Sequence, residues 1–181
     1  MPTVFAHALT GSAIAVLLPR LAHRRRLVIA LAAVAVLPDA DVLGFWLGIP
    51  YEHALGHRGF SHSILFAVLV GCAMPWLLHR CEPPRVKLWL AVGYALATAS
   101  HGIQDAMTDG GLGIGFWLPF SEARSFLPFR PVLTSSLNPA HALGLRGFQV
   151  LANEALWIGL PVVVTAGSIA WLRSRARRVN S

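Results

Sequence analysis

Five apolar segments divide this chain, and the connections between them hold most of its basic residues. The segments are Val4–Leu18, Leu27–Ile49, Ser63–His79, Leu88–Met107 and Ala155–Leu172. A membrane-spanning helix needs roughly 20 apolar residues, with a range of about 17–25. The second and fourth segments reach this length, the third and fifth lie at its short end, and the first is shorter. We therefore expect residues 1–181 to form one all-α domain, a polytopic membrane helix bundle with about four to five membrane helices.

Composition argues against the main soluble alternatives. Hydrophobic residues make up 55% of the chain and charged residues 13%, whereas an ordinary soluble domain is about 45–50% apolar and about 25% charged. A disordered chain or a soluble globule would carry more charge than this. The net charge of +7 could indicate nucleic-acid binding, but the motifs of a nucleic-acid-binding module are absent, so we expect no nucleic-acid partner.

The basic residues set the expected orientation. Eleven of the fifteen Lys and Arg residues fall in three short connections at alternate ends of the expected helices, at 20–26, 80–87 and 173–178. Short cytoplasmic loops are enriched in Lys and Arg. We therefore expect a multi-pass protein of a bacterial-type inner (plasma) membrane with its C-terminus in the cytoplasm. Residues 109–153 then form a long outer-side loop, whose composition suits short helices that cap the bundle.

Ionisable side chains within the apolar segments are concentrated at one depth. All four aspartates fall in the strings PDAD and HGIQDAMTDGG. Counted from the nearest basic cluster, His7 and Asp39 are 13 residues away, His62 is 18 and His101 is 14. At 1.5 Å per helical residue these spacings convert to roughly 20–27 Å, in the outer part of a hydrocarbon core about 30 Å thick. Four separate segments therefore deliver polar side chains to one level, near the outer face.

These side chains have the chemistry and spacing of a metal site. His101 and Asp105 are four residues apart, so they project from one helix face about one turn apart. Pro38 removes a backbone donor and is expected to kink the second segment, which lets Asp39 and Asp41 face one cavity. Imidazoles and carboxylates without thiolates favour Zn, Mn or Fe. The seven candidate ligands are His7, Asp39, Asp41, His57, His62, His101 and Asp105.

Seven ligands exceed the three or four that one tetrahedral ion takes from a protein. We therefore expect two or more divalent ions, zinc first and Mn or Fe as alternatives. Such sites hydrolyse phosphate esters with metal-activated water. Asp41 or Asp105 is the expected acceptor of the nucleophile's proton, and Arg58, beside two histidines, is expected to bind a phosphate oxygen. The alternative is that Arg58 only braces the turn before the third apolar segment.

Four further residues are candidates either for metal ligands or for groups that hold the ligands in place. They are Glu154, Asp109, Ser61 and Thr108. Glu154 is equally explained as an acid that complements a helix dipole, and Asp109 as a cap before Gly110. Ser61 also suits the N-cap of the third segment.

Other charged residues near these strings have weaker claims. His53 precedes His57 by four residues and is a reserve ligand, although an interfacial position explains it as well. The outer-side loop carries Arg124, Arg130 and Arg146, which are candidates for gathering an anionic headgroup of a substrate.

Four strings occur in an order that resembles a known family. They are HALTG at the N-terminus, LPDAD, GHRGFSHS and HGIQDAMTDGG. Together with FWLPFSEARSFLPFRP and RGFQVLANEALWIGLP, they resemble the YdjM-type family of membrane-bound, metal-dependent hydrolases over most of the chain. The resemblance implies that the seven candidate ligands bind metal. That family is distantly similar to the zinc-dependent phospholipase C group, which implies a phosphate-ester substrate.

The expected function is therefore metal-dependent hydrolysis of a phosphate ester. A lipid or lipid-linked phosphate is the expected substrate, and membrane lipid the expected partner, because a soluble substrate needs no membrane scaffold. A metal-binding membrane transporter and a non-catalytic membrane protein are the alternatives. Transporters usually show inverted repeats and a midplane site, and this sequence shows neither.

Reporter fusions test the orientation. A fusion after residue 82, within the second basic cluster, is expected to report a cytoplasmic position, and a fusion near residue 125 an external one. The measurement is the activity of a reporter that is active on one side of the membrane only. The reverse pattern would contradict both the orientation and the outer-facing site.

Overall fold

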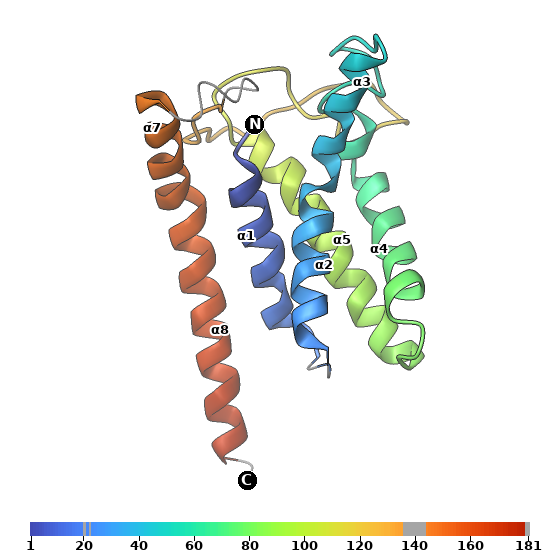
Figure 1. Ribbon diagram of the computed structural model, residues 1–181, viewed down its shortest axis with the longest axis vertical. Helices are drawn as coiled ribbons and strands as arrows, with labels where there is room; N and C mark the ends of the chain where they lie inside the picture. The colour runs from blue at the N-terminus through green and yellow to red at the C-terminus, as the bar shows by residue number, and fades with distance from the viewer. Residues whose placement is uncertain (20, 22, 136–143, 180–181) are drawn as a thin grey trace.

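The chain folds into a bundle of helices, shown in Figure 1 as a computed structural model that describes residues 1–19, 21, 23–135 and 144–179. The helices are α1 (Val4–Ile14), α2 (Arg24–Val36), α3 (Leu43–Trp46), α4 (Ile64–Leu78), α5 (Pro84–Ala106), α7 (Leu145–Glu154) and α8 (Leu160–Val179). Turns of 3-10 helix lie at Ala15–Leu17 (η1), Leu37–Val42 (η2) and Phe60–His62 (η3), and a π-helical turn at Ala155–Gly159 (η4) joins α7 to α8. The predicted all-α class is confirmed.

Helices α1, α2, α4 and α5 form the body of the bundle, and α8 stands at one edge beside α1 (Figure 1). Their facing sides bury apolar side chains that include Leu27, Leu31, Val34, Leu90, Tyr94 and Ala97. Glycines let the backbones approach closely, as in many membrane bundles. A Cβ atom on Gly11 would lie 2.5 Å from the carbonyl oxygen of Leu31, and one on Gly71 would lie 2.7 Å from that of Ala91.

Two helical segments among the described residues are long and apolar enough to cross a membrane, Arg24–Trp46 and Leu145–Ala176. Val4–Leu17 and Ile64–Leu78 are apolar but shorter. Helix α5, which we expected to span, has 23 residues but does not belong to this group, because its last turns carry polar side chains. The total of four to five membrane helices therefore stays a prediction.

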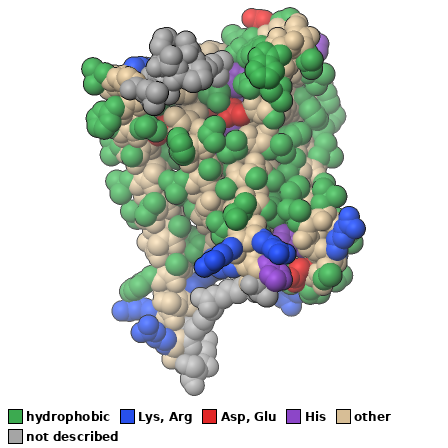
Figure 2. Space-filling view, viewed as in Figure 1, with side chains coloured by type: hydrophobic (Ala, Val, Ile, Leu, Met, Phe, Trp, Pro, Cys, Tyr) green, Lys and Arg blue, Asp and Glu red, His purple; other side chains and the backbone are tan. Residues whose placement is uncertain are grey.

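Side chains are sorted along the length of the bundle (Figure 2). On the visible face, most Lys and Arg side chains lie near the lower end, and hydrophobic side chains cover the length above them. The exposed apolar side chains include Ile29, Leu69, Trp76, Leu88 and Val164. An apolar exterior of this extent suits contact with lipid, because soluble proteins rarely expose large continuous apolar patches.

Helix α2 ends just before the PDAD string, and helix α4 begins just after the HRGFSHS string. Helix α2 ends at Val36, and Pro38 is the second residue of the 3-10 turn that follows. The proline thus lies where the helix type changes, and the kink expected from it stays a prediction. The expected cap at Ser61 is wrong. The hydroxyl of Ser63 instead accepts a hydrogen bond from the backbone N–H of Phe66 at 3.0 Å, which leaves the Ser61 side chain available elsewhere.

A loop covers one end of the bundle, which we call the loop end. The prediction of short helices in this region is wrong for residues 109–135, which contain no α-helix. Backbone hydrogen bonds hold the loop instead: Asp109 donates to Val132 at 3.0 Å, and Ile114 and Ser125 exchange two bonds of 2.8 and 3.0 Å. Regular helix resumes at Leu145, and residues 136–143 lie outside the described part of the chain.

The close contact at Gly11 predicts a measurable loss of stability. Gly11→Ala places a methyl group against the α2 backbone, which cannot move aside without disturbing the helix. We therefore expect the free energy of unfolding to fall by about 1–3 kcal/mol. Gly167→Ala in α8 is the matched control, because no atom lies within 4 Å of the new Cβ; its stability is expected to stay level or rise by up to about 1 kcal/mol. Unfolding in one detergent measures both, and equal effects would contradict the packing.

Candidate metal centre

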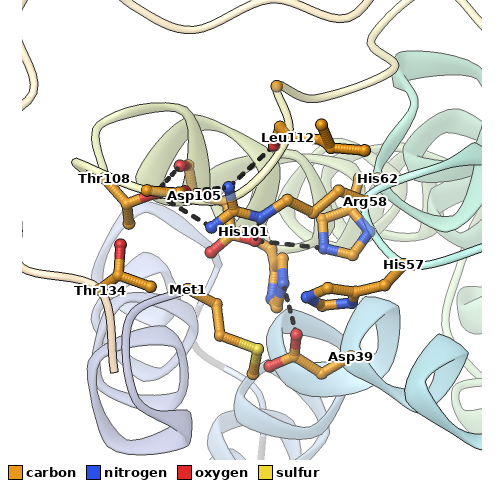
Figure 3. A network of polar contacts seen from close by, with 12 residues as sticks. Met1, Asp39, His57, Arg58, His62, His101, Asp105, Thr108, Leu112 and Thr134 are labelled. Atoms are coloured by element: carbon orange, nitrogen blue, oxygen red, sulfur yellow. Dashed lines mark hydrogen bonds and ion pairs between the residues drawn. The ribbon is translucent and has the colours of Figure 1, made fainter. Parts of the chain in front are cut away.

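The candidate ligands converge at the loop end from separate parts of the chain (Figure 3). Helix α1 contributes His7, the η2 turn contributes Asp39 and Asp41, and the segment through η3 contributes His57 and His62. The last two turns of α5 contribute His101 and Asp105. The single level predicted from residue spacing therefore corresponds to a single cluster.

Four of these residues form what we call the metal group: Asp39, His62, His101 and Asp105. All four are buried, and one ligand atom from each lies within 4.8 Å of the others. Nε2 of His101 is 3.3 Å from Oδ1 of Asp39, and Nε2 of His62 is 3.4 Å from Oδ2 of Asp105. Two ligands at about 2.0–2.1 Å on a tetrahedral ion would be about 3.3–3.4 Å apart.

The atoms of the metal group that face one another lie at ion-pair distances but form no hydrogen bonds among the described residues. Both imidazole Nε2 atoms and all four carboxylate oxygens of the group have no hydrogen-bond partner among the described residues. Buried polar atoms in proteins are nearly always paired, so a concentration of exceptions calls for a bound species. Two imidazoles and two carboxylates fit a divalent ion such as Zn, Mn or Fe.

Hydrogen bonds on the far side of the rings set their tautomers. Nδ1 of His101 is 2.7 Å from the carbonyl oxygen of Ala35, so this nitrogen carries the proton and Nε2 presents its lone pair. Nδ1 of His62 lies 2.9 Å from Oγ of Ser61 and 3.2 Å from Oδ2 of Asp41. Such outer contacts orient metal-binding histidines and raise their basicity.

Asp41 is surrounded by donors. Its Oδ1 accepts from Nδ1 of His57 at 2.7 Å, and its Oδ2 accepts from the hydroxyl of Ser61 at 2.6 Å and from the backbone N–H of Arg58 at 3.2 Å. Asp41, His57 and His62 also lie close enough to hold an ion. Because both Asp41 oxygens are already paired, we infer that Asp41 orients the two histidines.

His7 lies beside the metal group. Its ring stacks on that of His101 with a centroid separation of 3.7 Å and an interplanar angle of 15°. Its Nε2 is 3.6 Å from Oδ1 of Asp105, and neither ring nitrogen has a hydrogen-bond partner among the described residues. The structure thus places this predicted ligand next to the centre but outside the group of four.

Arg58 is buried and directed inward. Its Nε lies 3.2 Å from Oδ2 of Asp105, its Nη1 donates to the carbonyl oxygens of Gly110 and Leu112, both at 2.9 Å, and its Nη2 donates to Oγ1 of Thr108 at 3.0 Å. Its φ of 63° is left-handed, which is uncommon for a residue with a side chain. These contacts favour the bracing alternative over binding of a phosphate oxygen.

The weaker candidates lie around the centre with partners of their own. Thr108 is buried and donates to the carbonyl oxygen of Asp105 at 2.7 Å. Asp109 accepts from the backbone N–H and hydroxyl of Thr134 at 2.8 and 2.6 Å, and these bonds lower the pKa of Asp109 below its usual range. Glu154 accepts two hydrogen bonds from Thr3, at the junction of α1 and α7.

The three loop arginines are not gathered at the metal group. Arg124 donates to backbone carbonyl oxygens that include those of His53 and His57, both at 3.1 Å. It lines a cavity of about 580 Å³ whose other charged residues include Glu52 and Glu122, an unfavourable lining for an anion. The guanidinium of Arg130 lies over the Phe126 ring, 4.8 Å from its centroid, and Arg146 is exposed.

Sequence reasoning missed two parts of the site. Gln104 is buried, donates through Nε2 to Oγ1 of Thr10 at 2.7 Å, and has an unpartnered Oε1 among the described residues. Its position three residues after His101, on the same helix face, was an available signal. The carbonyl oxygen of Ala35 gave no such signal, because every residue has one. The reserve ligand His53 is exposed, and its Nδ1 accepts from the backbone N–H of Leu55.

The chain is similar to known inner membrane proteins over nearly its whole length. The family model described as "YdjM inner membrane protein" matches residues 1–179. The chain belongs to this family. It is similar to "Inner membrane protein YbcI" of Escherichia coli (strain K12), with 34% identity over 174 residues, which cover 96% of this chain and 99% of the relative. No solved structure matches. The predicted family and inner-membrane location are therefore confirmed for this YdjM-family protein.

The contacts of Arg58 predict a large effect on folding. Arg58→Met removes the cation that opposes the buried Asp105 carboxylate, and loss of one partner of a buried pair costs about 3–5 kcal/mol. Arg130→Met is the control, because the side chain of Arg130 is exposed and lies over the Phe126 ring, and we expect a change within about 0.5 kcal/mol. Denaturant unfolding in detergent measures both. If Arg58→Met folds with unchanged stability and loses only affinity for a phosphorylated lipid, Arg58 binds substrate instead.

Proposed function

We propose that this YdjM-family protein is a metal-dependent hydrolase that acts on a phosphate ester of a lipid or lipid-linked substrate. The observation that carries the proposal is the metal group, whose buried imidazole and carboxylate atoms face one another with no hydrogen-bond partner in the described part of the chain. A membrane protein that keeps so many ionisable groups buried is expected to use them, because each such group is costly in lipid.

In this proposal the metal group would hold a divalent ion, with zinc as the first choice and Mn or Fe as alternatives. Its ligands are Asp39, His62, His101 and Asp105. When bound by these residues, such an ion would polarise a phosphoryl oxygen and would lower the pKa of a water molecule. A second ion would draw on His7, whose ring stacks on that of His101.

The chain's own residues arrange the reaction around this centre. The bond from Nδ1 of His57 to Asp41 leaves Nε2 of His57 as a site that can take a proton. In this arrangement Nε2 of His57 takes the nucleophile's proton while Asp41 holds the ring through Nδ1. Asp105 is the other candidate acceptor. Arg58 holds Asp105 and the Thr108 side chain in position.

The membrane supplies the reason to propose a lipid. The family and the E. coli relative are described as inner membrane proteins, and the metal group lies at the loop end, away from the basic residues near the lower end of Figure 2. The enrichment of Lys and Arg in cytoplasmic loops then directs the site toward the outer face, with the C-terminus in the cytoplasm.

Metal analysis tests the centre without an assay of activity. We expect the chain purified without chelators to carry divalent metal, and His101→Ala and Asp105→Ala each to lose it, because each removes one of four ligands. His53→Ala is the matched control, since the side chain of His53 is exposed and its Nδ1 accepts from the backbone N–H of Leu55, away from the metal group. Elemental mass spectrometry of the purified variants is the measurement. Unchanged metal content in both site variants would reduce the cluster to a structural network.

Phosphate release then tests the chemistry. The metal-loaded protein is incubated with membrane phospholipids, lipid phosphates and a model phosphodiester, and cleavage is expected to stop on chelation and to return with added metal. A protein that retains metal yet cleaves none of these substrates under any metal condition would overturn the hydrolase proposal in favour of a metal-binding transporter.

A further inference from the structure

An apolar groove of about 260 Å³ runs between α1 and α8. Thr10, Ala13 and Ile14 line it from α1, and Val162, Thr165 and Ala166 line it from α8. These residues lie on the side of α1 that faces the edge helix, where α8 stands beside α1 in Figure 1. The groove therefore opens at the margin of the bundle, where lipid surrounds an inner membrane protein.

Fixed contacts bound the groove at both ends. Toward the loop end, Glu154 accepts two hydrogen bonds from Thr3, and Ile158 packs against Ala6. At the other end, the guanidinium of Arg173 donates to the carbonyl oxygen of Val16 and, at 3.0 Å, to that of Leu17. The last helix thus contacts the α1 segment at the loop end and again at Arg173, and the groove lies between these two contacts.

One residue that lines the groove on the side nearest the metal group, Thr10, is polar. The hydroxyl of Thr10, which lines the groove, accepts a hydrogen bond of 2.7 Å from the buried Gln104, whose Oε1 has no partner among the described residues. Thr10 follows His7 by three residues, about 4.5 Å along the helix axis. An amphiphile in the groove would therefore have its polar end directed toward the metal group.

The size of the groove limits what can occupy it. Thr10 and Leu17 are seven residues apart, about 10 Å along α1. A 10 Å length of helix about 10 Å across fills roughly 800 Å³, about three times the volume of the groove, so a helix of a second copy does not fit. A flexible hydrocarbon chain is thinner than a helix and suits an apolar groove of this volume.

We propose that this groove holds one acyl chain of a membrane phospholipid. That the bound lipid is also the substrate rests on the function proposed above. Binding of the acyl chain itself does not depend on metal or on catalysis, which allows the two proposals to fail separately.

Photolabelling tests the groove directly. The purified full chain, in vesicles of phosphatidylethanolamine and phosphatidylglycerol, is irradiated with a trace phospholipid that carries a diazirine in its acyl chain, and adducts are mapped by mass spectrometry. We expect adducts concentrated on the groove residues of α1 and α8, both with and without a chelator. Ala166→Trp fills the groove and is expected to lose most of them.

Val164→Trp is the matched control, because Val164 is 57% exposed and does not line the groove, and its labelling pattern is expected to match the wild type. Adducts spread evenly around α8, or equal yields from the two tryptophan variants, would show only surrounding lipid and overturn the proposal. Cross-links between two protein copies through the groove residues would overturn it as well.

A kinetic comparison separates the groove from the hydrolase proposal. With an active enzyme, Ala166→Trp is expected to raise KM for a long-chain lipid phosphate and to leave a short-chain analogue unaffected, whereas an equal effect on both would contradict acyl-chain binding. If no phosphorylated lipid is cleaved, the hydrolase proposal fails, and the labelling experiment still decides the groove.

Discussion

A carboxylate removed from water must be opposed by cations or hydrogen-bond donors, since burying it alone costs several kcal/mol. Asp105, fully buried near the end of α5, imposes this requirement on the loop end. Arg58 and His62, from the segment through η3, and His7, from α1, meet this requirement with nitrogens 3.2, 3.4 and 3.6 Å from its oxygens. The positions of those segments follow from the need to surround this one group.

The same requirement links the metal group to the loop that covers it. The guanidinium that contacts Asp105 also holds the carbonyl oxygens of Gly110 and Leu112. The loop end is thus held largely by polar contacts, whereas the body of the bundle depends on apolar packing and on close approach at Gly11. Ligand geometry and loop position are therefore parts of one arrangement.

Much of this arrangement could be predicted from residue spacing, because ionisable residues in apolar segments are few and helix rise converts position into depth. That argument places His101 and Asp39 together. It could not assign Arg58, whose long side chain turns inward from a left-handed backbone. Nor could it choose Ser63 over Ser61 as the helix cap, since Asp41, distant in sequence, takes the Ser61 hydroxyl.

The π-helical turn at Ala155–Gly159 has a geometric consequence for the last helix. Glu154 and Arg173, which both contact the α1 segment, are 19 residues apart. Five turns of regular α-helix take about 18 residues, so an uninterrupted helix would direct these side chains about 100° apart. A π turn accommodates about one extra residue, which restores their azimuthal phase. The π-helical turn thus lets the continuous α7–α8 helix contact the α1 segment at two places, through Glu154 and through Arg173.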